Sequence, residues 1–373
     1  MMESNMVKLG DLIEKYRHKC GDTKAIVSGV DINKQFIPTR ANLEGTDISG
    51  YYVVPPKYFA CNLMHIGRDE RIPIAYNSSS DYYVVTSAYY VFRIKEEKHN
   101  DVLGEYLYII FCIAEFDRLT WFYTDSSIRG NLREDRFLEI EIPLPSLAEQ
   151  QKVVNAWKAL REIKEQNEEI AAPLMQVCQS YIQELKHKYE SVEIGPYIEP
   201  CDERNKACIY GESLLRGVTS EGKFDASKAK TEGLKFDNYK VVNKGDFAYN
   251  PSRINLGSIA LCEMDKCIIS PMYVVFKIKA DASIGLLSEY LNLWFRRTEF
   301  QRSTLFFAAG SVRDTFDFNA MQNVRIPLPP LSVQQAIVNI YNCANEAKKI
   351  AAEADRMSRE VCTALIQHVI NNN

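Results

Sequence analysis

The chain has 373 residues, of which 46% are hydrophobic and 25% are charged, and its formal net charge is −4 at pH 7. These proportions are typical of an ordinary globular protein with two or three domains, and they argue against a disordered or fibrous chain. A pI of about 5.9 excludes the overall basic character of many nucleic-acid-binding domains, although a contact surface needs only local positive potential.

Targeting segments and metal sites are not expected. The start of the chain has no apolar run like that of a secretion signal, and no stretch is apolar for long enough to span a bilayer. The 10 cysteines occur singly, with no CxxC pair, and there are only 5 histidines. We therefore expect a cytoplasmic chain with reduced, mostly buried thiols, no membrane contact and no metal site.

Residues 1–145 are predicted to form a mixed head of strands and helices. Segments rich in β-branched and aromatic residues, such as YYVFRI at 89–94, indicate strands. One helix is predicted over Val102–Leu119. The phrase IPLP at 142–145 then requires an extended connector, because proline is disfavoured both inside helices and in central strands.

A long helix is predicted directly after this connector. Ser146 and Glu149 have the spacing of a capping box. Apolar residues recur at three-and-four spacing over 146–188, which is typical of a long helix with a narrow apolar seam. Pro173 lies inside this pattern and is expected to kink or interrupt the helix.

The second half of the chain repeats the first. EIPLPSLAEQQKVV at 141–154 recurs as RIPLPPLSVQQAIV at 325–338, so that Ile142 corresponds to Ile326. YYVFRI at 89–94 recurs as YVVFKI at 273–278 with the same offset, and a slightly larger offset aligns the segments further upstream. The sequence therefore predicts a tandem duplication of a unit of about 185 residues.

The second unit is predicted to contain the same elements in the same order. A helix is expected over Ile284–Thr304, and a second long helix begins near Ser332 and Gln335, which have capping-box spacing. The predicted strands of this head are 239–242, 246–250, 259–262, 267–270 and 272–278.

The predicted fold class is α+β, with two α/β heads in tandem repeat that two long antiparallel helices separate and join. The boundaries are 1–145 for the first head, 146–190 for the first long helix, 191–330 for the second head and 331–373 for the second long helix. The helices are expected to pack as a coiled-coil-like stalk with pseudo-twofold symmetry. In the alternative, each helix packs on its own head, but such long seams do not favour it.

Catalytic motifs are missing from the sequence. It has no phosphate-binding P-loop, no GxSxG nucleophile elbow and no HExxH. Asn250-Pro251 is the nearest approach to an adenine-methyltransferase signature, but Arg253 stands where an aromatic residue would stack on a flipped base. A turn after a strand is the favoured interpretation of this segment.

The doubled IPLPxLxxQQ phrase, each copy leading into a long helix, resembles the specificity (S) subunit of type I restriction-modification enzymes. Residues 244–260 and 310–331 also resemble the target-recognition domains of that family. The resemblance covers essentially the whole chain, in the order target-recognition domain, long helix, target-recognition domain, long helix.

The resemblance implies a non-catalytic reader of double-stranded DNA. Each target-recognition domain would read one half of a bipartite, asymmetric sequence, and the helices would act as a ruler between the halves. The helices would also bind two methyltransferase (M) subunits, and restriction (R) subunits would complete the enzyme. S-adenosylmethionine, ATP and Mg would be bound by those partners, and this chain would hold no cofactor.

Three candidate DNA contacts lie in one loop of the second head. Arg253 and Asn255 are expected between two strands, where an arginine can bind guanine O6 and N7 and an asparagine can bind adenine N6 and N7. Asn250 begins this loop. A surface charge or a phosphate contact is the alternative role for Arg253.

Four further candidates belong to a second loop that occurs in both heads. Ser311 and Arg313 are the counterparts of Ser127 and Arg129 at the same offset as the proline phrase. Two domains that read different sequences should differ at base-reading positions. The recurrence therefore favours contact with the DNA backbone, or a part in the architecture of the domain.

The first head departs from the second in its candidate loop. It reads CNLMHIGRDERIP where the second head reads YNPSRINLG, and TDSSIR where the second head reads AAGSVR. Arg68, Arg71 and Asn77 are the candidates for specificity in this divergent segment.

Two other functions stay open from the sequence. The chain could be a methyltransferase or nuclease with an unrecognised site, which methyl transfer by the purified chain alone would support. It could also be a duplicated protein-binding scaffold that uses the helical stalk. Heads with no Arg or Asn in their loops would favour a scaffold, but both heads have them.

Overall fold

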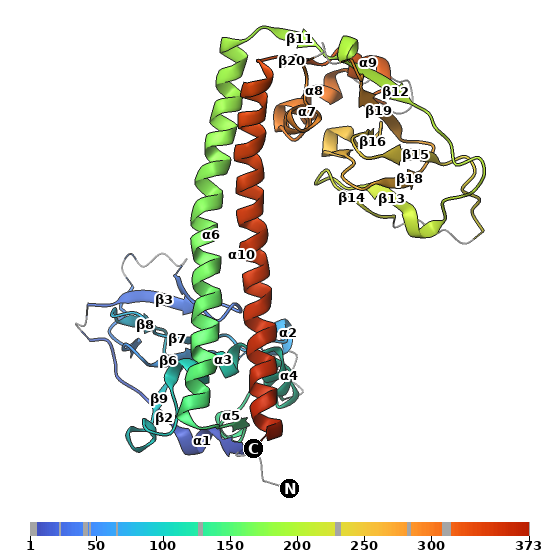
Figure 1. The fold of residues 1–373 in the computed structure, drawn as a ribbon. Helices are drawn as coiled ribbons and strands as arrows, with labels where there is room; N and C mark the ends of the chain where they lie inside the picture. The colour runs from blue at the N-terminus through green and yellow to red at the C-terminus, as the bar shows by residue number, and fades with distance from the viewer. Residues whose placement is uncertain are drawn as a thin grey trace. The chain divides into compact units, whose positions relative to one another are not determined.

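The computed structural model describes residues 6–21, 24–39, 44, 46–64, 66–125, 130–227, 233–281, 285–307 and 315–372. It confirms the predicted α+β class, with two sheet-rich heads and two long helices (Figure 1). The chain divides into two compact units, Met1–Glu168 with Lys349–Asn373 (unit 1) and Glu169–Lys348 (unit 2). Each unit thus contains one head and one half of each long helix. The pseudo-twofold relation between the heads stays a prediction.

Unit 1 begins with the first head. Its elements are β1 (Met6–Lys8), α1 (Leu9–Leu12), β2 (Ile13–Lys15), β3 (Ile26–Val30), β4 (Phe36–Pro38), β5 (Tyr52–Val54), β6 (Phe59–Cys61), α2 (Ile66–Asp69), β7 (Ile74–Tyr76), β8 (Tyr83–Val85), β9 (Tyr90–Ile94), η1 (Glu96–Lys98), α3 (Gly104–Cys112), α4 (Ala114–Phe122), α5 (Glu134–Leu138) and β10 (Glu141–Pro143).

Unit 2 contains the second head, with the same kinds of element in nearly the same order. Its elements are β11 (Ser191–Glu193), η2 (Gly195–Tyr197), β12 (Ile198–Cys201), η3 (Glu212–Leu214), β13 (Leu215–Val218), β14 (Phe224–Ala226), β15 (Lys240–Asn243), β16 (Phe247–Tyr249), η4 (Ile254–Leu256), β17 (Ile259–Leu261), β18 (Lys266–Ile269), β19 (Val274–Ile278), α7 (Ser288–Phe295), α8 (Thr298–Phe307), α9 (Phe318–Gln322) and β20 (Arg325–Pro327).

The two heads have the same sheet topology. The strand orders are β2-β9-β6-β7 and β4-β3-β8-β5 in the first head, and β12-β19-β16-β17 and β14-β13-β18-β15 in the second. Even the register agrees. Phe59 lies opposite Phe92 with their rings stacked 4.9 Å apart, and Phe247 lies opposite Phe276 at 5.0 Å. The duplication seen in the sequence is therefore a duplication of structure.

The repeated connector is tied to each head by buried hydrogen bonds. Gln150, with no exposed surface, accepts a hydrogen bond from the backbone amide of Leu103 at 2.9 Å and donates to the carbonyls of Asp101 and Pro145 at 2.8 Å each. The hydroxyl of Tyr106 donates to the carbonyl of Pro143 at 3.0 Å. The proline connector is thus held to the beginning of α3.

The single helices predicted over 102–119 and 284–304 are wrong, because each is two helices. In the first head the chain is extended at Ile113, with φ −75° and ψ 146°, and so separates α3 from α4. The bend brings Phe111 and Phe116 within 4.9 Å of each other, as it does Phe295 and Phe300 in the second head. A straight helix would not place both rings of each pair in the same core, since residues five positions apart do not share a helix face.

The two long helices are α6 (Leu147–Lys188) and α10 (Leu331–Asn372), of 42 residues each. The expected interruption at Pro173 is not found, because α6 continues through it. Pro173 has no N–H, so the carbonyl of Glu169 loses its usual hydrogen bond within the helix. Glu169 is exposed, and water can donate to this carbonyl instead.

The beginnings of the long helices correct the predicted capping boxes. The Ser146 carbonyl accepts from the amides of Glu149 and Gln150 at 3.0 Å each, but the Ser146 hydroxyl donates to the Glu149 carboxylate at 3.1 Å. In α10 the equivalent carbonyl belongs to Pro330, and Ser332 lies within the first turn. The repeat places Pro330, rather than Ser332, at the position of Ser146.

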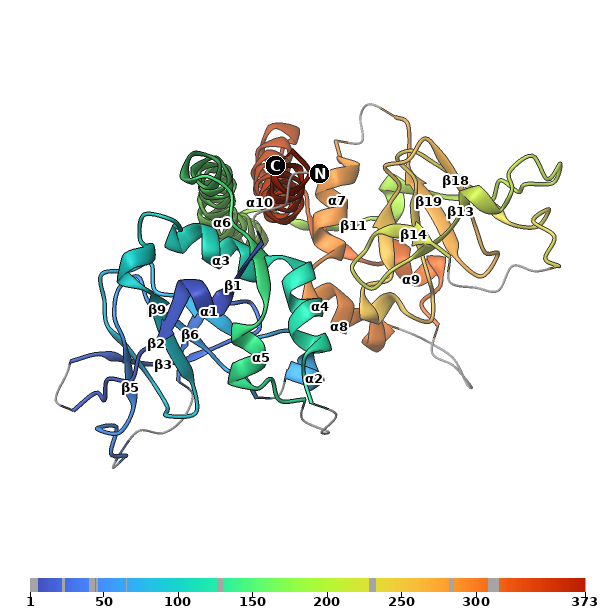
Figure 2. The same cartoon turned by 90° about the horizontal axis from the view of Figure 1, so that it is seen from below.

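In unit 1, the first part of α6 packs against the last part of α10 and against the head. Val153 and Val154 share a core with Cys362 and Ile366 of α10, and Lys164 pairs with Asp355 at 2.8 Å. The order of these partners shows that the two segments are antiparallel. Figure 2 shows α3 next to α6, where the Tyr108 and Trp157 rings lie 5.8 Å apart.

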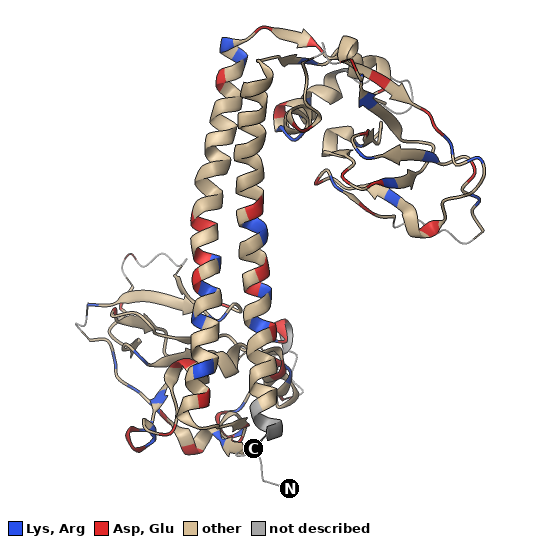
Figure 3. Cartoon of the chain, in the orientation of Figure 1, with Lys and Arg blue, Asp and Glu red and all other residues tan. Residues whose placement is uncertain are grey.

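In unit 2, the last part of α6 packs against the first part of α10. Cys178, Ile182 and Leu185 share a core with Ile337 and Val338. Figure 3 shows few charged residues on these halves of the helices, whereas the halves in unit 1 carry many. Alanines recur along one face of α10, of which Ala344 and Ala347 are buried in unit 2 and Ala351 and Ala354 in unit 1.

Candidate nucleic-acid interface

The β16–β17 loop (residues 250–258) contains the candidates of the second head. Arg253 is exposed, and no described residue bonds to its guanidinium. Its amide donates to the Asn250 carbonyl and its carbonyl accepts from the Leu256 amide, both at 3.0 Å. Asn255 follows within η4 and is half-buried. The backbone of the loop is thus ordered by its own turn while the Arg253 side chain stays available to a ligand.

Asn250 serves the turn itself. It is 6% exposed, its side-chain oxygen accepts from the Ser252 amide at 3.0 Å, and its own amide donates to the Ser258 carbonyl at 3.0 Å. The turn interpretation of Asn250-Pro251 is confirmed. Its burial leaves Asn250 poorly placed for a base edge.

Gly257 lets this loop approach its neighbours closely. Its φ is +92°, and a Cβ atom there would lie 2.3 Å from the Ser220 carbonyl oxygen and 3.1 Å from the side-chain nitrogen of Gln301 in α8. The Ser258 hydroxyl donates to the Val218 carbonyl at 2.9 Å. The loop is therefore packed between the β13–β14 turn and α8.

The β6–β7 loop (residues 62–73) is the equivalent loop of the first head, and it is the longer of the two. Arg71 is exposed there, and Arg68 lies in α2, but its side chain is outside the described part. Asn77 follows β7, is 1% exposed, and donates to the carbonyls of Val54 at 3.1 Å and Asp81 at 2.8 Å.

The side-chain oxygen of Asn77 is also used, because it accepts from the amide and the hydroxyl of Ser79 at 3.1 and 2.8 Å. Burial and these four bonds leave Asn77 no polar atom for a base. The structure thus makes Asn77 a structural residue, contrary to its prediction as a specificity residue.

Ser127, Arg129, Ser311 and Arg313 lie outside the described residues, but the chain that follows them does not. The Leu132 amide donates to the Leu63 carbonyl at 2.8 Å, and the Phe316 amide donates to the Pro251 carbonyl at 3.0 Å. These equivalent bonds join the chain after 126–129 and after 308–314 to the β6–β7 and β16–β17 loops. In each head, described chain shortly after the second candidate segment is therefore hydrogen-bonded to the first candidate loop.

A buried lysine anchors the β6–β7 loop. Lys34 is 5% exposed and lies at the β3–β4 turn with a φ of 68°. Its ammonium donates to the Ile72 carbonyl at 2.9 Å and pairs with Asp117 of α4, which accepts from the Ile72 amide at 3.1 Å. Burial lowers the pKa of Lys34 despite the attraction of Asp117.

In the second head, an arginine from a different element anchors the β16–β17 loop. Arg296, at the end of α7, donates to the Gly257 carbonyl at 3.2 Å and to the Ile259 carbonyl. A Cβ atom at Gly222, the repeat equivalent of Lys34, would lie 1.3 Å from the Arg296 guanidinium. The guanidinium thus fills the space that the lysine side chain enters in the first head.

The positive charge of Lys34 is balanced by a carboxylate, whereas that of Arg296 is not balanced within the described residues. Gln301 stands where the first head has Asp117, and no carboxylate among the described residues pairs with Arg296. Burial lowers the pKa of Arg296 to about 10. The sequence interpretation missed both cations, although the repeat aligns Lys34 with a glycine and Arg296 with Cys112.

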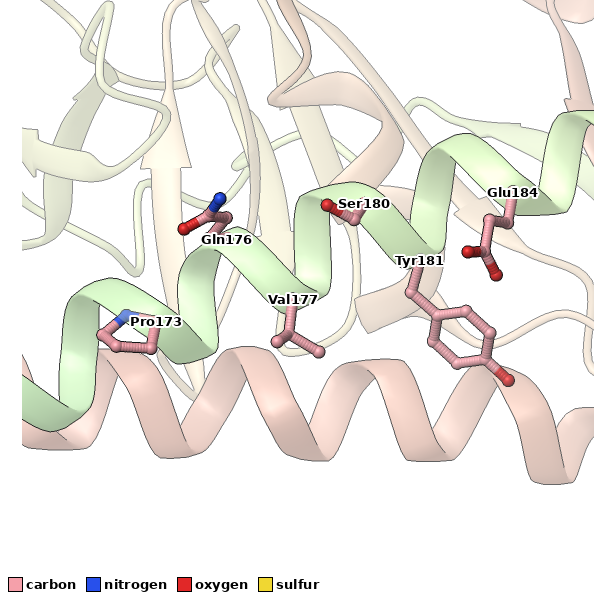
Figure 4. A pocket seen from close by; sticks show the side chains of 6 residues that line it. All are labelled: Pro173, Gln176, Val177, Ser180, Tyr181 and Glu184. Atoms are coloured by element: carbon pink, nitrogen blue, oxygen red, sulfur yellow. The ribbon is translucent and has the colours of Figure 1, made fainter.

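A hollow along α6 has no arrangement of side chains typical of a catalytic centre. It has a volume of about 410 Å³ and offers one carboxylate and no nucleophile paired with a base (Figure 4). It is lined by Pro173, Gln176, Val177, Ser180, Tyr181 and Glu184. No group of three or more metal-binding side chains was found among the described residues, and none of their helices is long and apolar enough to cross a membrane.

Comparisons with known proteins agree with this architecture. Residues 1–172 match the family model for the type I restriction modification DNA specificity domain. The S subunit of the type I restriction-modification system from M. genitalium has a similar fold, with a TM-score of 0.63 and 10% identity over 99% of this chain and 97% of that chain. No curated protein matches the chain in sequence.

Two other solved structures are similar over nearly the full length. The HsdS subunit from Thermoanaerobacter tengcongensis has a TM-score of 0.42 and 17% identity over 98% of this chain and 96% of that chain. A chain from a study of the complex assembly and conformational transition of a type I R-M system has a TM-score of 0.46 and 14% identity, over 98% and 97%. Residues 1–172 therefore match the type I restriction modification DNA specificity domain, and the chain as a whole has a fold similar to that of the M. genitalium specificity (S) subunit.

Proposed function

We propose that this chain reads a bipartite, asymmetric DNA sequence and performs no chemistry itself. One observation carries the proposal. The two heads share topology, register and the anchoring of one loop, yet that loop differs in length and sequence between them. A fixed framework with two different loops suits the reading of two different half-sites.

The exposed arginines supply the recognition chemistry in this proposal. Arg253 presents its guanidinium to solvent from an ordered turn, and Arg71 is exposed in the equivalent loop. A guanidinium can donate two hydrogen bonds to guanine O6 and N7 in the major groove, or it can bind a phosphate. Arg253 is our choice for a base contact because the equivalent loop of the first head has a different sequence.

The partners are M and R subunits, with two M subunits for each S chain. Support for the pair of M subunits comes from matched exposed groups at the beginnings of α6 and α10. Gln151 donates to the Asn155 side chain at 2.8 Å, and Gln335 donates to that of Asn339 at 3.0 Å. Two equivalent surfaces on one chain suit two copies of one partner.

Cofactors belong to those partners in this proposal. The M subunits bind S-adenosylmethionine and transfer its methyl group to adenine, and the R subunits use ATP and Mg to cleave unmodified DNA. The S chain holds none of these molecules. Its contribution is to place the M subunits on the correct sequence.

Methylation of genomic DNA tests this proposal. The S chain, its M subunit, and both together are incubated with labelled S-adenosylmethionine, and the product is sequenced with methylation detection. We expect methyl transfer only with both proteins, at two sequence blocks separated by a constant number of unspecified bases. Methyl transfer by the S chain alone would overturn the proposal, as would a methylated sequence with a single continuous block.

A further inference from the structure

Each head exposes a pair of large apolar residues at the end of a helix. Trp121 and Phe122 end α4 and are 45% and 77% exposed. Leu305 and Phe306, their repeat equivalents in the last turn of α8, are 58% and 84% exposed. Isolated exposed apolar residues are common, but a pair that recurs at the same place in both heads suggests a shared function.

An exposed arginine accompanies each pair. Arg118 and Arg302 lie four residues before Phe122 and Phe306, so each arginine and its phenylalanine share a helix face. Arg118 also pairs with Glu115 at 2.8 Å, but the two side chains are 75% and 63% exposed, so this pair is weak and easily exchanged.

In the second head, the carboxylate equivalent to Glu115 is that of Glu299, and it already has other partners. Glu299 pairs with Arg297 and with Lys186, the latter at 3.5 Å, and it accepts from Gln183 at 3.1 Å. Arg302 therefore presents its charge at the surface. Both heads combine a cation with an exposed phenyl ring.

These helices also support the candidate DNA loops. α8 packs against η4 of the β16–β17 loop, and Asp117 of α4 accepts from the Ile72 amide of the β6–β7 loop at 3.1 Å. In sequence, the repeated Ser and Arg candidates at 127, 129, 311 and 313 follow α4 and α8 within a few residues. The helices that carry the exposed pairs therefore contact the β6–β7 and β16–β17 loops in their own heads.

We propose that Arg118 with Phe122, and Arg302 with Phe306, form a second DNA contact in each head that does not depend on sequence. The guanidinium binds a backbone phosphate, and the phenyl ring packs against the adjacent sugar or partly enters a base step. DNA suits this surface because a cation beside an exposed aromatic ring matches a phosphate beside an apolar sugar and base face. The proposal rests on the proposed function.

The repeat explains why this contact is unlike that of the loops. The backbone is the part of DNA that is the same at both half-sites, so the residues that touch it can stay the same in both heads. Phe and Arg are kept, while Trp121 is replaced by Leu305, a change that packing against a sugar or base step tolerates.

The test uses the complete complex of S with M and the DNA target found by methylation mapping. Phe122→Ala and Phe306→Ala remove exposed rings, and Ile209→Ala removes another exposed apolar side chain, 74% exposed, as the control. We expect each phenylalanine variant to weaken DNA binding by about 5- to 150-fold, with the preferred bases unchanged. Arg302→Ala should lower the slope of binding against salt by about one.

Three outcomes would overturn the proposal. In the first, the phenylalanine variants bind DNA as tightly as the wild type. In the second, they lose the M subunit during purification while the affinity of the S chain for DNA is unchanged. In the third, the preferred base changes at one half-site. The second outcome would identify a protein-docking surface. Failure of the proposed function looks different, because the wild-type complex would then show no target-dependent binding at all.

Discussion

Gln150 and Gln334 make the same three hydrogen bonds in the two units. Gln334, also without exposed surface, accepts from the Leu287 amide at 2.9 Å and donates to the carbonyls of Gly285 at 2.7 Å and Pro329 at 2.8 Å. The first glutamine of each QQ pair therefore joins the proline connector to the helix of its head. This shared role explains why the phrase survives in both copies.

Gln150→Ala and Gln334→Ala should each destabilise their own unit by about 2–4 kcal/mol, because buried backbone groups lose their partners. Gln151→Ala and Gln335→Ala are the matched controls, since these side chains are exposed, and should cost about 0.5 kcal/mol or less. Urea unfolding checks both. Equal effects at the buried and exposed glutamines would contradict the role of the buried pair.

Lys34→Met should destabilise the first head by about 3–5 kcal/mol, because it leaves Asp117 buried without its cation. The double variant Lys34→Met with Asp117→Leu removes both charges and should recover much of that loss. Thermal or urea unfolding of the single and double variants measures the difference. A double variant less stable than the single one would show that the ion pair is not the main contribution.

Arg253→Ala should change binding at the second half-site alone. If the guanidinium reads guanine, its loss costs about 1–3 kcal/mol and relaxes the preference at one base position. If it binds phosphate, all sequences weaken and the salt slope falls by about one, as we expect for Arg313→Ala. Binding to a DNA library randomised in both half-sites, at two salt concentrations, separates these results. An altered first half-site would contradict the two-reader architecture.

The pair of Lys164 and Asp355 should make the stability of unit 1 depend on acid pH. The hydrogen bond from Lys164, with the charges of Lys164 and Arg359, holds the pKa of Asp355 below its ordinary value. A carboxyl group whose pKa is lower in the folded state stabilises the fold above its unfolded pKa of about 3.9, and this stabilisation is lost as the pH falls through the folded value.

Asp355→Asn should therefore cost about 0.5–1 kcal/mol at pH 7, since the pair is partly exposed. The difference from wild type should shrink as the pH is lowered from about 5 to about 3. Lys164→Met added to the Asp355→Asn variant is the control, because the ion pair is already lost there. A difference that stays constant over this range would mean that Asp355 does not titrate as the structure implies.

Lengthening both long helices should change the spacing between the half-sites and leave the bases themselves unchanged. Seven residues inserted after Gln166 in α6 and at the opposing part of α10 keep the apolar seam within about 20° of its phase. They add about 10 Å, or about three base pairs. Methylation mapping of the variant complex measures the new spacing. A folded variant that methylates the original spacing would remove the ruler from the proposed function.

The duplication, the two heads and the two long helices could all be predicted from the amino-acid sequence. Recurrence of a phrase at a fixed shift, and apolar residues at a helical period, are properties of the linear chain and need no knowledge of tertiary contacts. The strand YVVFKI and the proline connectors can be predicted for the same reason. They owe their conformations to neighbouring residues.

Which polar residues stabilise the fold and which face solvent depends on contacts between segments far apart in the sequence. Asn77 looked like a loop contact, yet its partners Val54 and Asp81 bury it, and one of them is 23 residues away. Lys34 and Arg296 were not among the candidates drawn from the sequence. Lys34 is buried and Arg296 is half-buried, and each donates to a carbonyl 37 or more residues away in sequence, which only the folding of the head brings near.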